Sequence, residues 1–320
     1  MAKESNSLRL RAQKLVEEGL KAYNNLEIRK AVNLLNEAVP LLKQESKRDL
    51  VQNLLTEIGQ MNYEIGDYQN ALKCLEEKLE IVSETGNQKE EIETLMGVSH
   101  LQLLLKNYNS ALINLKKALS LTREIGDLDG ERIVFLGMGT VYESLGKYDS
   151  AFRCFQETVG LNHRLGKYED EGESLLKLAR IYVKLGKYSA ALITFLEAFT
   201  VMKKIGSHKG EVRALKGAGN MYYTFEDYES ALLCYEEALS IHQLCDKTQD
   251  EEILIKIGET YAKLKNYMNA IKYLEDALEA VKKKTHGDEK TVQDIIKKLQ
   301  ASSKIYGLDH KYFHNNLTQN

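Results

Sequence analysis

The sequence of 320 residues contains no tryptophan and only one proline, Pro40, and it has no long apolar run. A membrane span needs roughly 20 mostly apolar residues, so none is expected. The initial segment MAKESNSLRLRAQKL also lacks the apolar core of a signal peptide. Because proline is nearly absent, almost every backbone N–H is free to join a helix. These absences predict a helical protein in the cytoplasm.

Excess positive charge and catalytic motifs are missing as well. There are 44 Lys and Arg against 47 Asp and Glu, a net charge of -3, whereas nucleic-acid-binding domains are usually strongly basic. The sequence has no GxxxxGK[ST], GxSxG or HExxH motif and no GxGxxG after a strand. Its histidines share no ligand spacing, and no CxxC pair occurs. We therefore expect neither an enzyme nor a nucleic-acid binder, and neither a metal site nor a cofactor.

A phrase that recurs at a fixed interval organises the chain. LGKYDSAF (Leu145–Phe152) returns as LGKYSAAL (Leu185–Leu192). The alanine of the phrase marks seven repeats, spaced by forty residues five times and by thirty-nine once: Ala31, Ala71, Ala111, Ala151, Ala191, Ala231 and Ala270. Six repeats carry tyrosine three residues before this marker, and all seven carry Gly, Ser or Ala twelve residues before it. Such regularity is typical of a supersecondary unit that buries its apolar face only against copies of itself.

The apolar spacing inside one repeat is helical. A first stripe consists of Phe135, Met138, Gly139, Tyr142 and Leu145, and a second consists of Tyr148, Ala151, Phe152, Phe155 and Val159. Two helices approach closely only where side chains are small, so Gly139 and Ala151 should mark their crossing. Each repeat is therefore expected to be a helical hairpin.

Glycines on a twenty-residue ladder predict where the helices end. The ladder consists of Gly66, Gly86, Gly126, Gly146, Gly166, Gly186 and Gly206, with gaps at Lys106, Glu226 and Asp246. Glycine accepts the left-handed conformation that closes a helix, which gives helices of about seventeen residues. Cys74, Cys154 and Cys234 lie two repeats apart, too distant for disulfides, and are expected to be buried thiols.

These residues resemble the tetratricopeptide repeat (TPR), and the likeness extends from Ala12 to about Ala280. Standard repeats of that family are 34 residues long, so the forty-residue form is similar to the class found in LGN/Pins and rapsyn adaptors. Only Gly219-Asn220 keeps the Gly-Asn pair of those adaptors. The resemblance implies an all-α fold, a right-handed superhelix (solenoid) of seven TPR-like hairpins over residues 1–286.

The end of the chain departs from the repeat. A stripe of Val292, Ile295, Ile296 and Leu299 predicts a capping helix over residues 287–305. Residues 306–320 form a polar tail with two aromatics, Tyr312 and Phe313. This tail is expected either to be flexible or to act as a docking peptide or strap.

Function should lie on the stripe of each first helix that does not pack, which the resemblance places in a concave groove. Basic residues gather on this stripe from repeat five onward, whereas Glu17, Glu57 and Glu64 make repeats one and two acidic. Lys177, Arg180, Arg213 and Lys216 are expected to converge with few acids nearby. The predicted partner-binding residues are Lys177, Arg180, Lys184, Arg213, Lys216, Asn220, Tyr223 and Lys256. An acidic or amphipathic peptide or helix of another protein would fit such a surface, which makes an adaptor or scaffold the favoured function.

Several alternatives stay open. Lys216 and Asn220 match part of the carboxylate clamp of chaperone-adaptor TPR domains, but Lys256 replaces the next asparagine of that clamp. The charges could simply solvate an exposed helix face. The chain could also be a structural subunit of a larger, perhaps cytoskeletal, assembly that uses convex or edge surfaces. A peptide-pheromone sensor is not expected, because the first repeat begins by about Leu8 and leaves no space for an effector domain. The sequence does not predict the oligomeric state.

Overall fold

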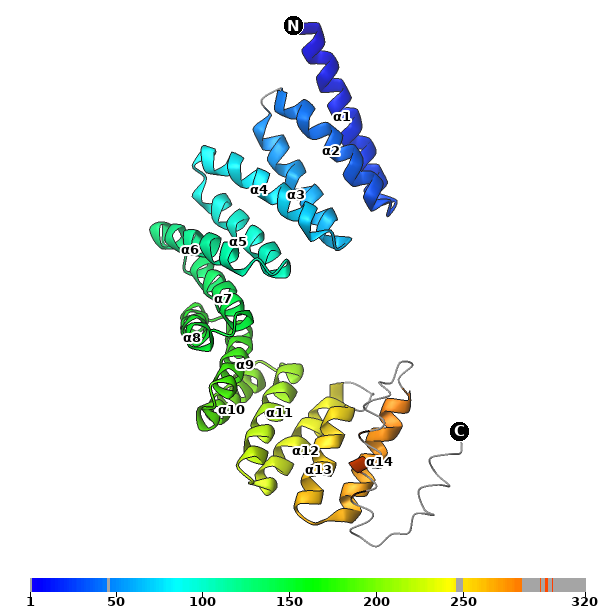
Figure 1. Cartoon of the computed structure of the whole chain (residues 1–320), viewed down its shortest axis with the longest axis vertical. Helices are drawn as coiled ribbons and strands as arrows, with labels where there is room; N and C mark the ends of the chain where they lie inside the picture. Colours follow the sequence, from blue (N-terminus) through cyan, green and yellow to red (C-terminus); the bar gives the residue numbers. More distant parts are fainter. Residues whose placement is uncertain are drawn as a thin grey trace. The chain divides into compact units, whose positions relative to one another are not determined.

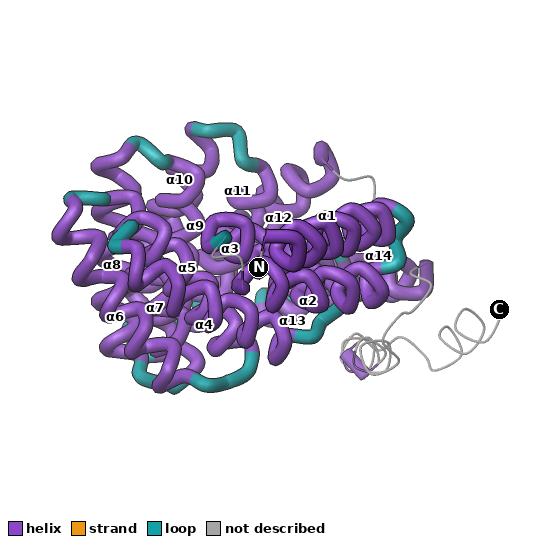
Figure 2. The backbone as a smooth tube through the Cα atoms, turned by 90° about the horizontal axis from the view of Figure 1, so that it is seen from above, coloured by secondary structure: helices purple, strands orange, loops and turns teal. Residues whose placement is uncertain are grey.

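A computed structural model describes residues 2–44, 47–245 and 250–283, together with the single residues 294, 297, 298 and 301. These residues are helical apart from short turns and contain no strand (Figures 1 and 2). Fourteen helices follow one another along the described chain: α1 (Ala2–Asn24), α2 (Ile28–Gln44), α3 (Arg48–Glu64), α4 (Tyr68–Thr85), α5 (Gln88–Leu104), α6 (Tyr108–Ile125), α7 (Leu128–Ser144), α8 (Tyr148–Leu165), α9 (Tyr168–Lys184), α10 (Tyr188–Lys204), α11 (His208–Thr224), α12 (Tyr228–Cys245), α13 (Glu251–Lys263) and α14 (Tyr267–Lys283). The predicted all-α solenoid of helical hairpins is confirmed.

Each marker alanine lies in an even-numbered helix, three residues after the first residue of that helix, which is tyrosine in six of them and Ile28 in α2. Even-numbered helices pack against the odd-numbered helices that precede them, as α2 does against α1 (Figure 1). Contacts divide the chain into two compact units, Met1–Glu157 and Thr158–Asn320, with the boundary inside α8. Within each unit, successive helices pack against one another.

The predicted crossing of the two helices is present in the fourth hairpin. A Cβ atom placed on Gly139 of α7 would lie 2.7 Å from Cε1 of Phe155 in α8. In the same way, a Cβ atom placed on Gly219 of α11 would lie 2.6 Å from Cε1 of Tyr235 in α12. The seven marker alanines are all fully buried. Small residues at these positions therefore let the paired helices approach closely around large core side chains.

The glycine ladder closes helices as predicted, and the structure explains two of its gaps. All seven ladder glycines have positive φ, and Lys106 and Glu226 adopt the same left-handed conformation, each with φ of 62°. The packed helices on either side therefore impose this backbone conformation even where no glycine is available. Asp246, the third gap, lies outside the described residues.

Because a side chain in the left-handed region is strained, Lys106→Gly and Glu226→Gly should each raise the free energy of unfolding by about 0.5 to 1 kcal/mol. Urea denaturation measures this change. As a control, Lys116→Gly on the exposed face of α6 should lower stability by about 1 kcal/mol. Equal destabilisation by Lys106→Gly and Lys116→Gly would contradict the explanation.

Two expectations about the end of the chain concern residues that are mostly not described. The predicted capping helix (287–305) and polar tail (306–320) lie outside the described residues, except for residues 294, 297, 298 and 301, which are helical. Of these, Lys298 forms an ion pair with Glu259 of α13 at 2.6 Å.

Candidate functional site

The predicted partner-binding residues lie on three consecutive odd-numbered helices of the second unit. Lys177, Arg180 and Lys184 belong to α9, Arg213, Lys216, Asn220 and Tyr223 to α11, and Lys256 to α13. Arg180, Lys184, Arg213 and Asn220 are exposed, and the other four are half-buried. The helical spacing of three or four residues thus aligns them on exposed faces of α9, α11 and α13.

Two of the basic residues have acidic neighbours, so the expectation of few nearby acids is wrong at these positions. Arg213 of α11 forms an ion pair with Glu173 of α9. Lys216 contacts Glu252 of α13 and also lies 3.6 Å from Asp250, the residue that caps α13. Glu173, Arg213 and Glu252 occupy the same position in successive repeats. This alternation of charge brings Arg213 beside Glu173, while Lys216, one turn after Arg213 on α11, reaches Glu252.

Asn220 and Tyr223 are held by aromatic and cationic neighbours. The hydroxyl of Tyr235 donates a hydrogen bond to Oδ1 of Asn220 at 2.7 Å. The Tyr223 ring lies 5.9 Å from Nζ of Lys256 and 5.2 Å from the ring of Tyr228. Both residues therefore have fixed orientations, with Tyr223 still half-buried at the surface.

The charge of Lys256 is compensated locally. Lys256 donates to Glu259 at 3.0 Å, and Lys298 donates to the same carboxylate at 2.6 Å. Burial alone would raise the pKa of Glu259, but the hydrogen bonds from Lys298 and Lys256 lower this pKa overall. Glu259 is therefore ionised at neutral pH, and Lys256 adds little to the positive charge of the surface.

The lysines that are not paired with a described carboxylate lie on α9. Lys177 and Lys184 form no ion pair with any residue that the structure describes, whereas Arg180 has an interaction partner. Between Glu173 and Lys184 the exposed stripe of α9, and between Arg213 and Tyr223 that of α11, together carry five cations, Lys177, Arg180, Lys184, Arg213 and Lys216, against one carboxylate, Glu173. One turn earlier, the two stripes carry one charge of each sign, Glu169 and Lys209. These two helices therefore present a net positive surface, which we call the basic stripe.

A carboxylate clamp at Lys216 and Asn220 would have to form from side chains that already have partners. Lys216 contacts two carboxylates of α13 and its side chain is only 20% exposed. Asn220 uses its amide oxygen for Tyr235, which leaves its amide nitrogen as a donor. The geometry thus gives Lys216 a role in joining α11 to α13.

A recurring glutamate at the start of odd-numbered helices is a feature that sequence reasoning missed. Glu91 and Glu131 lie at the same position of successive repeats, as do Glu171 and Glu211, and all four side chains are at most 15% exposed. Glu91 accepts hydrogen bonds from Lys117 at 2.6 Å and from Ser83 at 2.8 Å. The signal was present in linkers such as REIGDLDGE, whose last residue is Glu131. Glu91, Glu131 and Glu171 each join their helix to a neighbouring helix, whereas Glu211 contacts His208 of its own helix.

Burial alone would raise the pKa of Glu91, but the hydrogen bonds from Lys117 and Ser83 and the charge of Lys117 lower this pKa overall. The carboxylate therefore stabilises the fold above the pKa of an unfolded glutamate, about 4.3, and this contribution is lost as the pH falls through the lower folded pKa. We expect Glu91→Gln to cost about 1 to 3 kcal/mol at pH 7 and much less in strong acid. Urea denaturation of parent and variant across this range measures the difference, and a cost that does not change with pH would contradict it.

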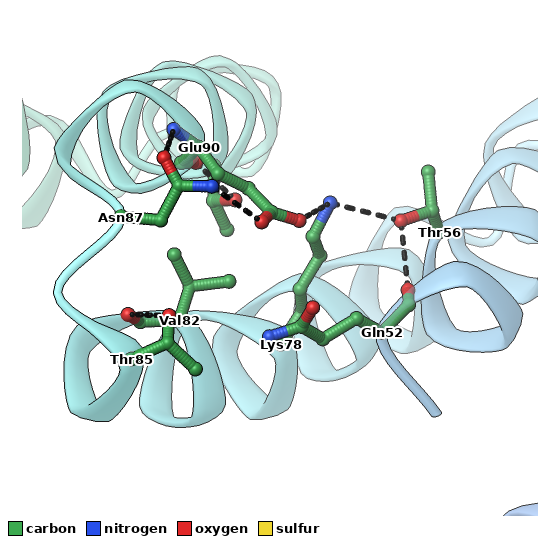
Figure 3. A network of polar contacts seen from close by, with 8 residues as sticks. Gln52, Thr56, Lys78, Val82, Thr85, Asn87 and Glu90 are labelled. Carbon is green, nitrogen blue, oxygen red and sulfur yellow. Dashed lines mark hydrogen bonds and ion pairs between the residues drawn. The ribbon is translucent and has the colours of Figure 1, made fainter. Parts of the chain in front are cut away.

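Lys78 forms a polar bridge at a position where most repeats have alanine. Figure 3 shows its amine between Thr56 of α3, at 3.1 Å, and Glu90 of α5, at 3.3 Å. Thr56 in turn donates to the carbonyl of Gln52, and the side chain of Asn87 caps the backbone N–H of Glu90. The bridge joins three helices, which gives this departure from the repeat pattern a structural role.

Three of the four cysteines are shielded from solvent, whereas Cys245 is exposed. Cys74 and Cys154 are buried as predicted, whereas Cys234 is half-buried. Burial raises the pKa of each of these three thiols to about 11, so they stay protonated at neutral pH. In the part of the chain that the structure describes, no three His, Cys, Asp or Glu side chains gather to hold a metal ion. None of the described helices combines the length and apolar character that crossing a membrane requires.

Solved structures share this fold at low sequence identity. A STAND signal-transduction ATPase with a tetratricopeptide repeat sensor from Pyrococcus horikoshii aligns with a TM-score of 0.69 at 19% identity, over 92% of this chain and 49% of that protein. This chain thus spans about half of that relative. BtubC (BKLC) from P. vanneervenii aligns with a TM-score of 0.58 at 17% identity, over 67% of this chain and 90% of that one. A tetratricopeptide repeat protein from Parabacteroides merdae gives 0.54 at 17% identity, over 92% and 99%.

The family itself is identified by sequence comparison. No curated protein matches the chain. Models of the tetratricopeptide repeat, however, match residues 50–124, 131–204 and 251–280, which together make up more than half of the sequence. Together with the paired helices and the structural relatives, these matches show that the chain belongs to the tetratricopeptide repeat family.

Proposed function

We propose that this protein is a non-catalytic, cytoplasmic adaptor that binds a peptide or helical segment of a partner protein across the odd-numbered helices of its second unit. Tetratricopeptide repeats suggest a protein-interaction role, and the basic stripe supports an acidic or amphipathic partner. The observation that carries the proposal is the excess of five cations over one carboxylate on the basic stripe of α9 and α11. Lys177 and Lys184 are the contacts that a partner carboxylate reaches most easily, because no described residue pairs with them.

Arg213 would contribute by exchanging partners. Both Arg213 and Glu173 are substantially exposed, so water screens their attraction and the pair contributes about 0.2 to 1 kcal/mol. A carboxylate of the bound segment could replace Glu173 at little cost, and a bidentate contact with the guanidinium would be stronger. Tyr223 offers an apolar surface beside these charges, which suits an amphipathic segment.

Selection of binders from a random peptide library on the parent protein tests this proposal. We expect the selected peptides to be enriched in Asp and Glu. Selection on the Lys177→Glu, Lys184→Glu double variant should lose this enrichment, since both side chains are unpaired and their reversal leaves the fold intact. Peptides without acidic residues, or the same acidic peptides from both proteins, would overturn the proposal.

One observation favours the second candidate, a structural subunit that uses its outer surface. Ile193 of α10 and Leu233 of α12 occupy the same position of neighbouring repeats, and they are 66% and 68% exposed. Exposed apolar side chains that recur in neighbouring repeats can form part of an interface. If Ile193→Lys with Leu233→Lys abolishes capture of a partner that the Lys177→Glu, Lys184→Glu variant retains, this candidate replaces the adaptor.

A further inference from the structure

Two clefts open in the first unit, and they differ in character. The cleft between α2 and α4 has a volume of about 910 Å³, and its walls carry both signs of charge, including Lys43 and Glu77, which already form an ion pair. The cleft between α1 and α3 has a volume of about 700 Å³ and is lined mainly by apolar groups. Pockets of this volume commonly bind ligands. Only the second cleft has a chemistry that specifies its occupant.

The α1–α3 cleft has an apolar floor and exposed apolar edges. Its floor is formed by Ala12, Val16, Leu42 and Leu54. Leu20 of α1 and Leu50 of α3 line it as well, yet they are 41% and 52% exposed. Covering them would remove apolar surface from water, at a gain of roughly 25 cal/mol per Å². At one end, the hydroxyl of Tyr23 donates to the carboxylate of Glu64 at 3.1 Å and connects the two helices.

The charged residues that line this cleft have one sign. Glu17 of α1 and Glu57 of α3 lie in its lining, and Glu64 lies at the Tyr23 end. No lysine or arginine is among the described residues that line it. A molecule that binds in this cleft must therefore cover apolar surface and also place cations beside Glu17 and Glu57.

We propose that the α1–α3 cleft binds a basic amphipathic helix of a partner protein. The wall from Ala12 to Tyr23 is about 16 Å long, equal to about three turns of helix. A helix of that length places apolar side chains at i, i+4, i+7 and i+11 along one face, and this face covers Leu20 and Leu50. Lysine or arginine residues beside that face pair with Glu17 and Glu57. This second site goes beyond the adaptor function proposed above, because it prefers the opposite charge and belongs to the other compact unit.

A synthetic helix tests the site. The probe is an amphipathic peptide of about 14 residues, with leucines at the four anchor positions and lysines beside them. We expect it to bind the full chain, and Leu50→Lys to weaken this binding at least tenfold, since the lysine both removes apolar contact and repels the peptide. Glu17→Lys with Glu57→Lys should also weaken it, and rising salt should weaken binding to the parent. Fluorescence anisotropy of the labelled peptide gives each affinity.

Matched controls separate the site from general attraction. A scrambled peptide of the same composition should bind far more weakly, and Ile113→Lys on the exposed surface of α6 should leave binding unchanged. Lys177→Glu with Lys184→Glu should also leave it unchanged, so failure of the basic-stripe proposal would not affect this result. Equal affinity for the scrambled peptide, or no effect of Leu50→Lys, would overturn the proposal. Dissociation of a dimer by Leu50→Lys, without peptide binding to the parent, would instead assign the cleft to a second copy of the chain.

Discussion

Ala151→Arg should destabilise the fourth hairpin by several kcal/mol. Ala151 is completely buried in α8, on the helix that also carries Phe155 against Gly139 of α7. An arginine there would have to displace closely packed side chains or bury its charge without a partner, and either change costs on the order of 3 to 5 kcal/mol. Urea denaturation measures the loss, and hydrogen exchange should localise it to α7 and α8.

The control for this change is Gln156→Arg, which lies on the same helix but is exposed. It should alter the free energy of unfolding by less than about 0.5 kcal/mol. Similar denaturation midpoints for the two variants would show that the hairpins do not cross at the marker alanine.

Gly219→Leu should cost about 2 to 4 kcal/mol, because its Cβ alone would lie 2.6 Å from the ring of Tyr235. That ring is almost fully buried, and its hydroxyl is held by Asn220, so it cannot move aside without losing a hydrogen bond. Thermal or urea unfolding measures the change.

Gly160 provides the matched comparison within the same unit. It also lies inside a helix, α8, but no atom would come within 4 Å of a Cβ placed there. Gly160→Leu should therefore stabilise the protein slightly, by up to about 1 kcal/mol, because leucine favours the helix more than glycine does. If both glycine variants change stability equally and in the same direction, close approach is not the reason for glycine at position 219.

The fold was predictable because every repeat carries the same types of residue at the same positions. Small residues, a tyrosine and a closing glycine recur at fixed positions, and the helix ends observed at Thr85 and Ile125 directly precede ladder glycines. Lys106 and Glu226 interrupt the glycine pattern, yet their backbone is also left-handed. This conformation follows from the packing of the neighbouring helices rather than from the conformational preference of lysine or glutamate. The repeated pattern thus predicts the helical hairpins even where one repeat has a different residue at a key position.

The candidate site was predictable only in part. The spacing of Lys177, Arg180 and Lys184 on one helix follows from the helical period, and these residues do share α9. The pairing of Arg213 with Glu173 depends instead on how neighbouring helices align, which the spacing within a single helix does not encode. The α1–α3 cleft could not be predicted, because its volume depends on the separation of two helices that no residue pattern encodes.

The affinity of an acidic peptide, selected on the parent, for three forms of the protein tests the adaptor account most directly. The forms are the parent, the Lys177→Glu, Lys184→Glu double variant and Glu173→Gln, measured by anisotropy at low salt with circular dichroism as a check on folding. We expect the double variant to bind at least tenfold more weakly, a loss of about 1.4 kcal/mol. Glu173→Gln should bind up to about fivefold more tightly, because it removes the carboxylate that competes for Arg213. If all three forms bind the peptide equally, the basic stripe is only a solvated helix face and the adaptor account is contradicted.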